Sequence, residues 1–500
     1  MNILEEIIEN KKKEILELKK NFVMPQNFKK RNFAFYKALS QESIYPKLIA
    51  EIKPKSPSKG QLFRSDDSVE SLAKLYSDSG AMAISVLTDE NFFGGSIENI
   101  RKVREITNLP ILRKDFILDE IQIYEAAEYG ADAVLLMRSV LDAKTIQKFL
   151  SILQELGMDA LVEVHDEEEL FDVLKNTDAR IVGVNNRNLQ VNRDCNVDSR
   201  DKALSCLYEL NLNNFHDLFS KVPENMRKEK IFVCESGISS RNDIRKYAKN
   251  ADAILIGTAI IASDDRKKTL YDLSGKPEVK ICGITNLEDA ILAGKDADYL
   301  GFVFAEESPR RILLEDARKI VENIREHAMK KPKFVGVFVN PLNVETRLIA
   351  SLHEYNFLDV IQLHGDETPE FCREFVVETR YSASLRNKPK IWKALRIINE
   401  SDLQKISEYS FCDAVLLDAY SEKSRGGTGK QISLELLKKI PKYLAEGQKF
   451  FVAGGITPEN VQEIIKSCFP NGIDVNSGVE KSVGRKDEEL LKNLFTIFIN

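Results

Sequence analysis

Short apolar runs alternate with longer amphipathic stretches along most of the 500-residue chain. The runs have the length of buried strands, and the stretches between them have the period of helices. From residue 48 onward, the first eight runs lie at residues 48–53, 81–87, 110–114, 132–137, 159–164, 181–186, 231–236 and 252–257. Strands that alternate with helices are typical of parallel βα units. Eight units in roughly 210–220 residues predict a (β/α)8 barrel, a fold of about 250 residues.

A second set of eight runs follows a polar break. Residues 264–268 are charged, and residues 275–277 contain a glycine and a proline, so we place a domain boundary there. The second runs lie at residues 278–282, 298–304, 333–339, 359–363, 390–395, 413–418, 450–455 and 472–476. We therefore predict two fused (β/α)8 TIM barrels, residues 1–262 and 278–500, joined by a linker at 263–277. A doubly wound open sheet is the alternative for either half, but two consecutive sets of eight favour closed barrels.

The first barrel carries an N-terminal extension. Apolar residues recur at helical spacing among glutamates and lysines within residues 1–20. This pattern predicts an amphipathic helix before the first strand, and the second set of runs has no such leading helix.

Composition narrows the classes of partner. The net charge is −6 and the basic residues are spread along the chain, so nothing indicates a nucleic acid or an anionic membrane as partner. No apolar run reaches the length of a membrane span, and the N-terminus lacks the order of a signal peptide. The seven cysteines are scattered, without a Cys-x-x-Cys pair or zinc-ligand spacing. We therefore expect a reduced, cytoplasmic protein without a structural metal.

Glycine-containing loops close both sets of runs in the same way. The first set ends with residues 235–238 and then 256–258, and the second ends with residues 453–456 and then 476–478. Loops after strands seven and eight of such barrels often bind phosphate, because glycine lets backbone N–H groups approach the phosphate oxygens. Plain turn glycines are the alternative, but the recurrence favours phosphate. The predicted phosphate-binding residues of the second barrel are Gly454, Gly455, Ser477 and Gly478.

Charged and polar side chains end several strands of the first set. Glu51 and Lys53 are two residues apart and therefore share one face of a strand, where burial is costly unless the charges are used. Further strands end in Lys114, Glu163, Asn185 and the pair Glu235 and Ser236. A charged surface hairpin at residues 51–60, or structural salt bridges, are the alternatives for single residues. As a set, groups that converge on a barrel mouth suit general acid–base catalysis.

Five segments of the first set resemble the indole-3-glycerol-phosphate synthase family: residues 51–58, 112–116, 161–165, 183–189 and 235–238. The resemblance covers about residues 1–262. It implies that the substrate 1-(2-carboxyphenylamino)-1-deoxyribulose 5-phosphate loses CO₂ and water as the indole ring closes, without a cofactor. It also implies that Lys114 is the general acid at the ribulose carbonyl and that Glu163 is an acid/base. The residues that orient the substrate and stabilise developing charge would be Glu51, Lys53, Asn185 and Ser236.

The same resemblance assigns the binding residues of the first barrel. Those that hold the phosphate would be Ser56, Gly237, Gly257 and Thr258, with Arg187. Phe93 and Phe116 would form an aromatic pocket for the anthranilate ring, although an ordinary core role fits them nearly as well. Residues 190–230 are longer than the corresponding link in the family, which indicates an insertion near the mouth: a lid, a partner surface or an inert addition.

The second barrel has its own candidate chemistry. Lys280 and Cys282 share one face of the first strand, and Asp418 ends the sixth. A cysteine at such a position is either a small buried hydrophobe or, with a lowered pKa, a thiolate base. Arg310 offers a cation for a carboxylate. The glycine-rich residues 425–430 are not a Walker loop, because no Ser or Thr follows the lysine.

The second set resembles the phosphoribosylanthranilate isomerase family in residues 280–286, 308–310, 362–365, 417–418, 426–430 and 454–456. The resemblance covers about residues 278–498 and implies an Amadori rearrangement of N-(5-phosphoribosyl)anthranilate. Asp418 would protonate the ring oxygen, Cys282 would take the proton from the neighbouring sugar carbon, and Arg310 would bind the anthranilate carboxylate. His364 is expected to be structural or to contact the ring.

The two resemblances support each other, because the isomerase product is the synthase substrate. We therefore predict one chain that carries two successive steps of tryptophan biosynthesis and binds phosphorylated anthranilate–sugar substrates as a monomer. The alternatives are a pair of sugar-phosphate isomerases or epimerases from other pathways, and a non-catalytic metabolite-binding scaffold. For the first barrel, Lys53, Lys114 and Glu163 argue against the first alternative. The argument against the second is that four residues are intact: Cys282, Asp418, Lys114 and Glu163.

Overall fold

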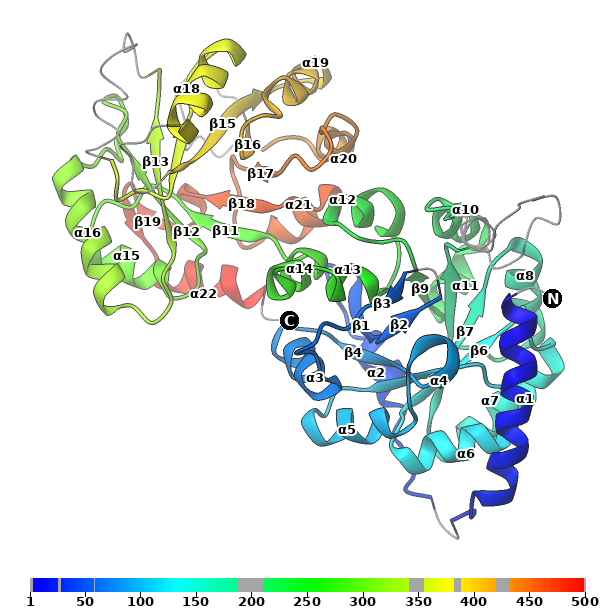
Figure 1. The fold of residues 1–500 in the computed structure, drawn as a ribbon. Coiled ribbons are helices and arrows are strands. Elements are labelled where there is room, and N and C mark those ends of the chain that lie inside the picture. The colour runs from blue at the N-terminus through cyan, green and yellow to red at the C-terminus, as the bar shows by residue number, and fades with distance from the viewer. Residues whose placement is uncertain are drawn as a thin grey trace. The chain divides into compact units, whose positions relative to one another are not determined.

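The structure, a computed structural model, describes residues 3–25, 28–57, 59–187, 210–340, 355–381, 388–419 and 431–498. The chain forms two compact units, Met1–Gly275 and Lys276–Asn500. The division lies within the boundary segment predicted at residues 263–277. Each unit is described by itself below (Figure 1).

The first unit is a closed barrel of eight parallel strands, as predicted. Its strands are β1 (Lys47–Ile52), β4 (Ala83–Leu87), β5 (Ile111–Lys114), β6 (Ala133–Met137), β7 (Asp159–Val164), β8 (Ile181–Asn185), β9 (Ile231–Glu235) and β10 (Ala253–Ile256). β1 pairs with both β4 and β10 and so closes the barrel. A two-stranded antiparallel hairpin, β2 (Lys55–Ser56) with β3 (Gly60–Gln61), follows β1.

Helices surround the first barrel. The predicted N-terminal helix is present as α1 (Ile3–Asn21). The others are α2 (Ala34–Leu39), α3 (Val69–Asp78), α4 (Glu90–Phe93), α5 (Glu98–Ile106), α6 (Glu120–Tyr129), α7 (Ala143–Leu156), α8 (Glu167–Asn176), α10 (Asn214–Lys221), α11 (Glu224–Glu229), α12 (Arg241–Asp243), the π-helix η1 (Ile244–Ala248), α13 (Thr258–Ile261) and α14 (Arg266–Leu273). Helix α14 occupies most of the predicted linker and buries Leu270 and Leu273 in the core of the first unit. Of the predicted insertion, residues 190–209 lie outside the described residues, and residues 210–230 contain α10 and α11.

Alternation along the strands divides the apolar residues into two layers. Residues such as Ala50, Ile52 and Val134 face the helices and join one large cluster with them. Residues such as Ile49, Leu161 and Val233 form a second cluster that fills the barrel interior. On β1, β5, β7 and β9 the inward series continues toward the carboxyl end with the charged residues Glu51, Lys114, Glu163 and Glu235, and this change marks the mouth of the barrel.

The second unit is also a closed barrel of eight parallel strands. Its strands are β11 (Glu278–Ile281), β12 (Tyr299–Val303), β13 (Lys333–Phe338), β14 (Val360–Leu363), β15 (Lys390–Ile397), β16 (Ala414–Ala419), β17 (Phe450–Val452) and β18 (Gly472–Val475). Its helices are α15 (Leu287–Gly294), α16 (Leu314–His327), α18 (Pro369–Tyr381), α19 (Glu400–Leu403), α20 (Leu434–Lys439), α21 (Val461–Cys468) and α22 (Glu488–Thr496), with 3-10 turns η2 (Gln404–Tyr409), η3 (Ile440–Lys442) and η4 (Ser477–Val479). A small hairpin of β19 (Glu480–Ser482) and β20 (Arg485–Lys486) follows η4.

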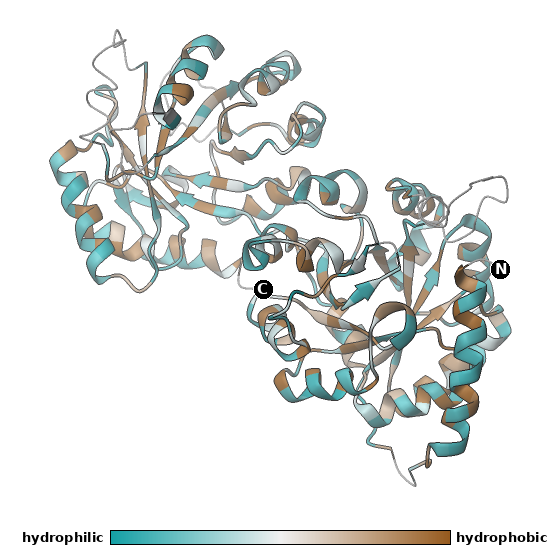
Figure 2. Cartoon of the chain, in the orientation of Figure 1, coloured by the Kyte–Doolittle hydropathy of each residue, from teal (hydrophilic) through white to brown (hydrophobic). Residues whose placement is uncertain are grey.

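Aromatic rings fill the interior of the second barrel below its mouth. Tyr299, Trp392 and Phe451 pack against one another with ring centroids 4.3–5.9 Å apart. A side chain at Gly472 would overlap the ring of Phe451, so glycine is required beside these rings. Figure 2 shows both hydrophilic and hydrophobic colour along the helices of each unit, as expected for helices that cover a barrel. Among the described residues, no helix combines the length and the apolar character needed to span a membrane.

Candidate active sites

Glu51 and Lys53 lie inside the first barrel and not on a surface hairpin. Their exposed fractions are 4% and 9%, and the Lys53 ammonium donates a hydrogen bond to Glu51 Oε1. Burial acts to raise the pKa of Glu51, but the cations of Lys53, Lys114 and Arg187 outweigh it and hold the pKa below its usual value. A side chain at Gly257 would overlap the Glu51 carboxylate, so this glycine makes room for Glu51.

Lys114, at the end of β5, links two carboxylates from β7 and β9, which flank β8 in the barrel. Its ammonium donates to Glu163 Oε2 and to Glu235 Oε2, both at 2.9 Å. Burial acts to lower the pKa of Lys114, but these carboxylates and Glu51 outweigh it and raise the pKa above its usual range. The three side chains therefore form one buried charged group in which Lys114 stays protonated at neutral pH.

The two carboxylates bound to Lys114 differ in charge state. Burial acts to raise the pKa of Glu163, but Lys114 and His165 outweigh it and hold the pKa well below its usual range. Burial raises the pKa of Glu235 to about 7, an effect that Glu163 reinforces and Lys114 opposes. One carboxylate is therefore ionised and its neighbour titrates near neutrality, an arrangement that suits proton transfer.

His165, which directly follows β7, contacts Glu163. Its Nε2 lies 3.3 Å from Glu163 Oε1, and its Nδ1 lies 3.3 Å from Glu169 Oε2 on helix α8. Burial acts to lower the pKa of His165, but the hydrogen bonds to both glutamates raise it to about 10. The imidazolium between them therefore helps to keep Glu163 ionised.

Asn185 and Ser236 lie at the ends of the adjacent strands β8 and β9. Asn185 is buried, and its Oδ1 accepts a hydrogen bond from Arg187 N at 3.0 Å. Ser236 has a φ of 66° and Gly237 a φ of 82°. A serine in the left-handed region is a strained conformation of the kind that clusters at functional sites. The chain therefore turns sharply at Ser236 and Gly237, directly after β9.

The described part of the predicted insertion contacts this turn. Asn214 Nδ2 donates to the backbone carbonyls of Asn185 and His165, at 3.0 and 2.9 Å. A side chain at Gly237 would overlap Leu210 and Leu212. Residues 210–214 therefore pack on the ends of β7 and β8 and on the loop after β9.

The predicted phosphate-binding residues lie in loops that leave neighbouring strands. Ser56 follows β1, Gly237 follows β9, and Gly257 and Thr258 follow β10, which lies between those strands in the barrel. Ser56 is buried, and its Oγ accepts a hydrogen bond from Lys59 N at 3.1 Å. Arg187 follows β8, the next strand around the barrel.

Phe93 and Phe116 lie together, as a shared pocket wall requires. Their ring centroids are 6.3 Å apart and the rings are tilted by 38°. Both side chains are partly exposed rather than buried in the core. Phe93 ends helix α4 in the loop after β4, and Phe116 lies in the loop after β5, two residues beyond Lys114.

In the second barrel, Cys282 lies beside a fully buried ion pair. Lys280 Nζ donates to Asp474 Oδ2 at 2.7 Å. Burial raises the pKa of the Cys282 thiol and Asp474 adds to the effect, while Lys280 and Lys486 act to lower it. The thiol is therefore the resting form, with a lysine placed to stabilise a thiolate.

Asp418 is held by His364, the residue that follows β14. His364 Nε2 lies 3.2 Å from Asp418 Oδ2, and its Nδ1 lies 2.7 Å from Gln362 Nε2. With the Gln362 amide in this orientation, Nδ1 accepts a hydrogen bond and Nε2 donates one to Asp418. His364 thus contacts the proposed acid directly, which the sequence did not predict.

Arg310 forms a two-pronged ion pair with Glu480. Its Nε lies 2.9 Å from Oε1 and its Nη2 lies 2.7 Å from Oε2. Lys486 also donates to Glu480 and to Asn476 Oδ1, at 3.0 and 3.2 Å. Arg310 and the loop after β18 therefore form one network beside Cys282.

The glycine loops of the second barrel touch each other. Gly454 and Gly455 have φ values of 85° and 59°, which end β17 at Val452, earlier than predicted. A side chain at Gly478 would overlap the carbonyl of Ile456, so the loops after β17 and β18 are in contact. Ser477 begins the short turn η4. The glycine-rich residues 425–430 lie outside the described residues.

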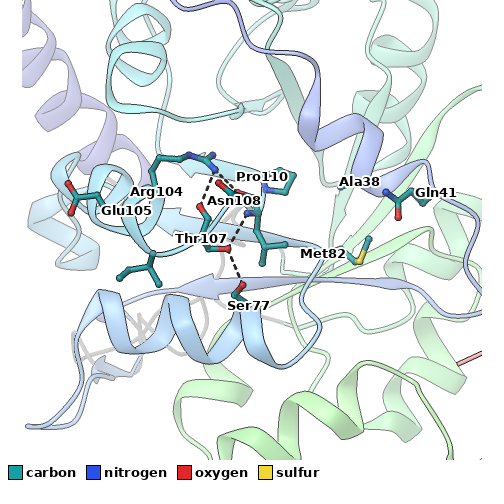
Figure 3. A pocket seen from close by; sticks show the side chains of 11 residues that line it. Ala38, Gln41, Ser77, Met82, Arg104, Glu105, Thr107, Asn108 and Pro110 are labelled. Atoms are coloured by element: carbon teal, nitrogen blue, oxygen red, sulfur yellow. Dashed lines mark hydrogen bonds between the residues drawn. The ribbon is translucent and has the colours of Figure 1, made fainter. Parts of the chain in front are cut away.

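One cavity, of about 560 Å³, lies away from the predicted site residues (Figure 3). It is lined by residues such as Met82, Thr107 and Pro110, which precede β4 and β5. Active sites of this fold lie at the carboxyl ends of the strands, so this cavity is at the opposite end of the first barrel.

Several residues of the two mouths were not predicted as site residues. Glu235 was noted only as a strand end, although its alternation with Val233 places it on the inner face. His165 and Asp474 carry the same signal. His165 lies two residues after Glu163 on the inward series, and Asp474 lies two residues after Gly472. Glu480 and Lys486 had no such signal, because they lie in a hairpin beyond the last strand.

Two closed barrels, each with an ionisable cluster and glycine loops at one end, define a fused pair of (β/α)8 enzymes. A family model of indole-3-glycerol phosphate synthase matches residues 4–273, and one of N-(5'-phosphoribosyl)anthranilate isomerase matches residues 279–496. The chain belongs to the family of the bifunctional tryptophan biosynthesis protein TrpCF. The second barrel isomerises N-(5-phosphoribosyl)anthranilate, and the first converts the product into indole-3-glycerol phosphate.

Relatives resemble this chain over nearly its whole length. The TrpCF protein of Haemophilus influenzae is 34% identical over 504 residues, which cover 99% of this chain and 96% of the relative. That of Helicobacter pylori strain J99 is 33% identical over 500 residues, which cover 99% of each. The phosphoribosylanthranilate isomerase structure from Thermotoga maritima is 33% identical and covers 45% of this chain and 98% of its own, with a TM-score of 0.38.

Proposed function

We propose that the first barrel closes the indole ring with Lys114 as general acid and Glu163 as acid/base. The observation that carries this assignment is the Lys114 ammonium held 2.9 Å from both Glu163 and Glu235. A protonated Lys114 can donate to the ribulose carbonyl as the ring carbon attacks it. An ionised Glu163 can then accept a proton during dehydration, and Glu235, near its pKa, can exchange protons with both.

The remaining residues of the first mouth bind and orient the substrate in this proposal. Glu51, Lys53, Asn185 and Ser236 steady the charge that develops at the sugar. The phosphate lies against the loops after β9, β10 and β1, through Gly237, Gly257, Thr258 and Ser56, with Arg187 as the nearby cation. The adjacency of these strands supports a single phosphate site.

Phe93 and Phe116 form the pocket for the anthranilate ring in this proposal. We expect Phe93→Ala to raise KM for ring closure about tenfold, since a lost aromatic contact costs about 0.5–1.5 kcal/mol beyond the buried area. Steady-state kinetics of the synthase reaction check this result. Phe93→Leu, which keeps apolar volume, should recover part of the loss, and isomerase kinetics should not change. An unchanged KM in Phe93→Ala would place Phe93 outside the pocket.

Glu235 should make the stability of the first barrel depend on pH. Its pKa of about 7 in the folded chain lies above the ordinary value of 4.5 for a glutamate. The contribution of Glu235 to the free energy of unfolding is therefore fully present below pH 4.5 and is lost as pH rises through 7. The total change in that free energy is about 3 kcal/mol. We expect Glu235→Gln to gain stability relative to the parent chain between pH 5 and 8. The outcome that contradicts this is a stability difference independent of pH.

The two barrels can be followed separately in that measurement. Trp392 is the single tryptophan and lies in the core of the second barrel. Its fluorescence reports on the second unit, while calorimetry detects both units. In Glu235→Gln, only the unfolding transition of the first unit should change, and this is the transition that calorimetry detects but the fluorescence does not.

In the second barrel, we propose that Asp418 protonates the ring oxygen and that Cys282 removes the proton from the neighbouring sugar carbon. Lys280 is placed to stabilise the thiolate that the second step needs, and His364 holds Asp418 in position. Arg310 binds the anthranilate carboxylate through Nη1, since Nε and Nη2 form the ion pair with Glu480. The phosphate lies against Gly454, Gly455, Ser477 and Gly478.

The experiment that tests these roles assays the two reactions separately on single variants. Each variant receives N-(5-phosphoribosyl)anthranilate in one assay and the deoxyribulose phosphate in the other. The proposal requires every named variant to impair one reaction and spare the other. The monomeric state and cytoplasmic location remain predictions, and light scattering on the purified chain measures the first.

A further inference from the structure

We propose that Lys11 on helix α1 is a positioning residue of the synthase reaction. Its ammonium joins the loops after β4 and β5. It thereby fixes the separation of Phe93 and Phe116, the two walls of the proposed ring pocket. This inference rests on the proposed role of Phe93 and Phe116 in binding the anthranilate ring.

Lys11 lies at the centre of a buried ionic cluster. Its side chain is 3% exposed, and its Nζ lies 2.9 Å from Asp115 Oδ1, 3.0 Å from Asp89 Oδ2 and 2.6 Å from Glu14 Oε2. Asp89 and Asp115 are 0% and 3% exposed. The two aspartates come from different loops of the mouth, so the lysine connects the N-terminal extension to both.

Each aspartate holds the backbone beside one of the walls. Asp89 Oδ1 accepts a hydrogen bond from Phe92 N at 2.9 Å and caps α4, the helix that ends at Phe93. Asp115 Oδ1 accepts from Phe116 N at 2.8 Å, and its Oδ2 accepts from Thr88 Oγ1 at 2.6 Å. The cation between the aspartates therefore sets the relative position of two backbone segments, one for each ring.

Attachment of α1 does not account for this lysine. The three buried residues of the helix are Ile7, Lys11 and Ile15, so the charge occupies the middle of an otherwise apolar stripe. An apolar residue there would attach the helix as well or better, because burying an ion pair is costly. Attachment is also provided by Lys19 with Asp119, at 2.5 Å. What an apolar residue cannot do is hold two carboxylates at fixed positions.

Asp115 also ties the wall to the proposed acid. Asp115 directly follows Lys114 in the sequence, and Arg113, which directly precedes Lys114, donates to Asp115 Oδ2 at 3.1 Å. A shift of Asp115 would therefore move both Lys114 and Phe116. The expected kinetic consequence is a loss in turnover as well as in ring binding.

The test compares Lys11→Met with Lys12→Met, a matched change at the next, exposed residue. We expect Lys11→Met to lower kcat/KM of ring closure about 10–100-fold, because small misplacements of reacting groups cost up to about 100-fold. Lys11→Arg, which keeps the charge, should restore most of the rate. Competitive inhibition by inorganic phosphate, which probes only the phosphate loops, should be unchanged, as should isomerase activity and the Lys12→Met control.

Three outcomes would overturn the inference. The first is synthase kinetics in Lys11→Met equal to those of Lys12→Met. The second is an equal weakening of phosphate and substrate binding, which indicates general loosening of the barrel. The third is failure of Lys11→Arg to restore the rate in a folded chain. If Phe93→Ala also leaves the synthase kinetics unchanged, the assignment of the ring pocket is wrong. If Phe93→Ala raises KM and Lys11→Met does not change the kinetics, only the role of Lys11 is wrong.

Discussion

Lys114→Met should reduce ring closure by about 10³-fold, within the range that general acid–base groups contribute, and leave isomerisation unchanged. Methionine keeps most of the length and volume of lysine but cannot donate a proton. It also leaves Glu163 and Glu235 without the cation that they share at 2.9 Å. The pKa of Glu163, which Lys114 now holds down, should therefore rise, so the variant loses the acid and also keeps a smaller fraction of Glu163 ionised to act as a base.

The measurement follows product formation from the deoxyribulose phosphate at several pH values. Because two buried carboxylates lose their cation, we expect some loss of stability, so calorimetry must show that the first barrel is folded at the assay temperature. Lys148→Met, at an exposed lysine paired with Glu120, is the matched control. Loss of both activities in a folded chain would contradict the assignment of the two reactions to separate barrels.

The architecture and the strand-borne half of each site were predictable from the sequence. Apolar runs and their spacing predicted both barrels, and a period of two placed Glu51, Lys53 and Lys280 on inner faces. The same rule, applied to every strand, also places Glu235 and Asp474 inside. The positions of strand residues follow from local alternation, which is why these residues could be inferred without tertiary information.

Contacts made by loops and extensions could not be predicted in this way. Arg310 was predicted as a cation for the anthranilate carboxylate, but its ion pair with Glu480, 170 positions away in the chain, was not predicted. Lys11 was one of many lysines in an amphipathic helix, and its partners Asp89 and Asp115 lie in two separate loops. Such pairs depend on how the loops pack over the mouth, and hydrophobic periodicity carries no information about that packing.

Asp418→Asn should reduce isomerisation by about 10³-fold and leave ring closure unchanged. Asparagine has nearly the shape of aspartate and can still accept the hydrogen bond from His364 Nε2. It cannot give a carboxylic proton to the ring oxygen, so the loss should appear in kcat more than in KM. Cys282→Ser should give a similar loss, because a hydroxyl beside Lys280 is a much poorer base than a thiolate.

Cys412→Ser is the matched control for Cys282→Ser, since Cys412 is also buried in the second barrel and burial raises its pKa to about 12. Both serine variants bury a hydroxyl in place of a thiol, so a shared loss of stability is expected, while only Cys282→Ser should lose turnover. Exchange of the sugar C–H proton with solvent separates the two roles further. This exchange requires the base, so Cys282→Ser should abolish it. If Asp418→Asn does not slow ring opening, Asp418 is not the acid.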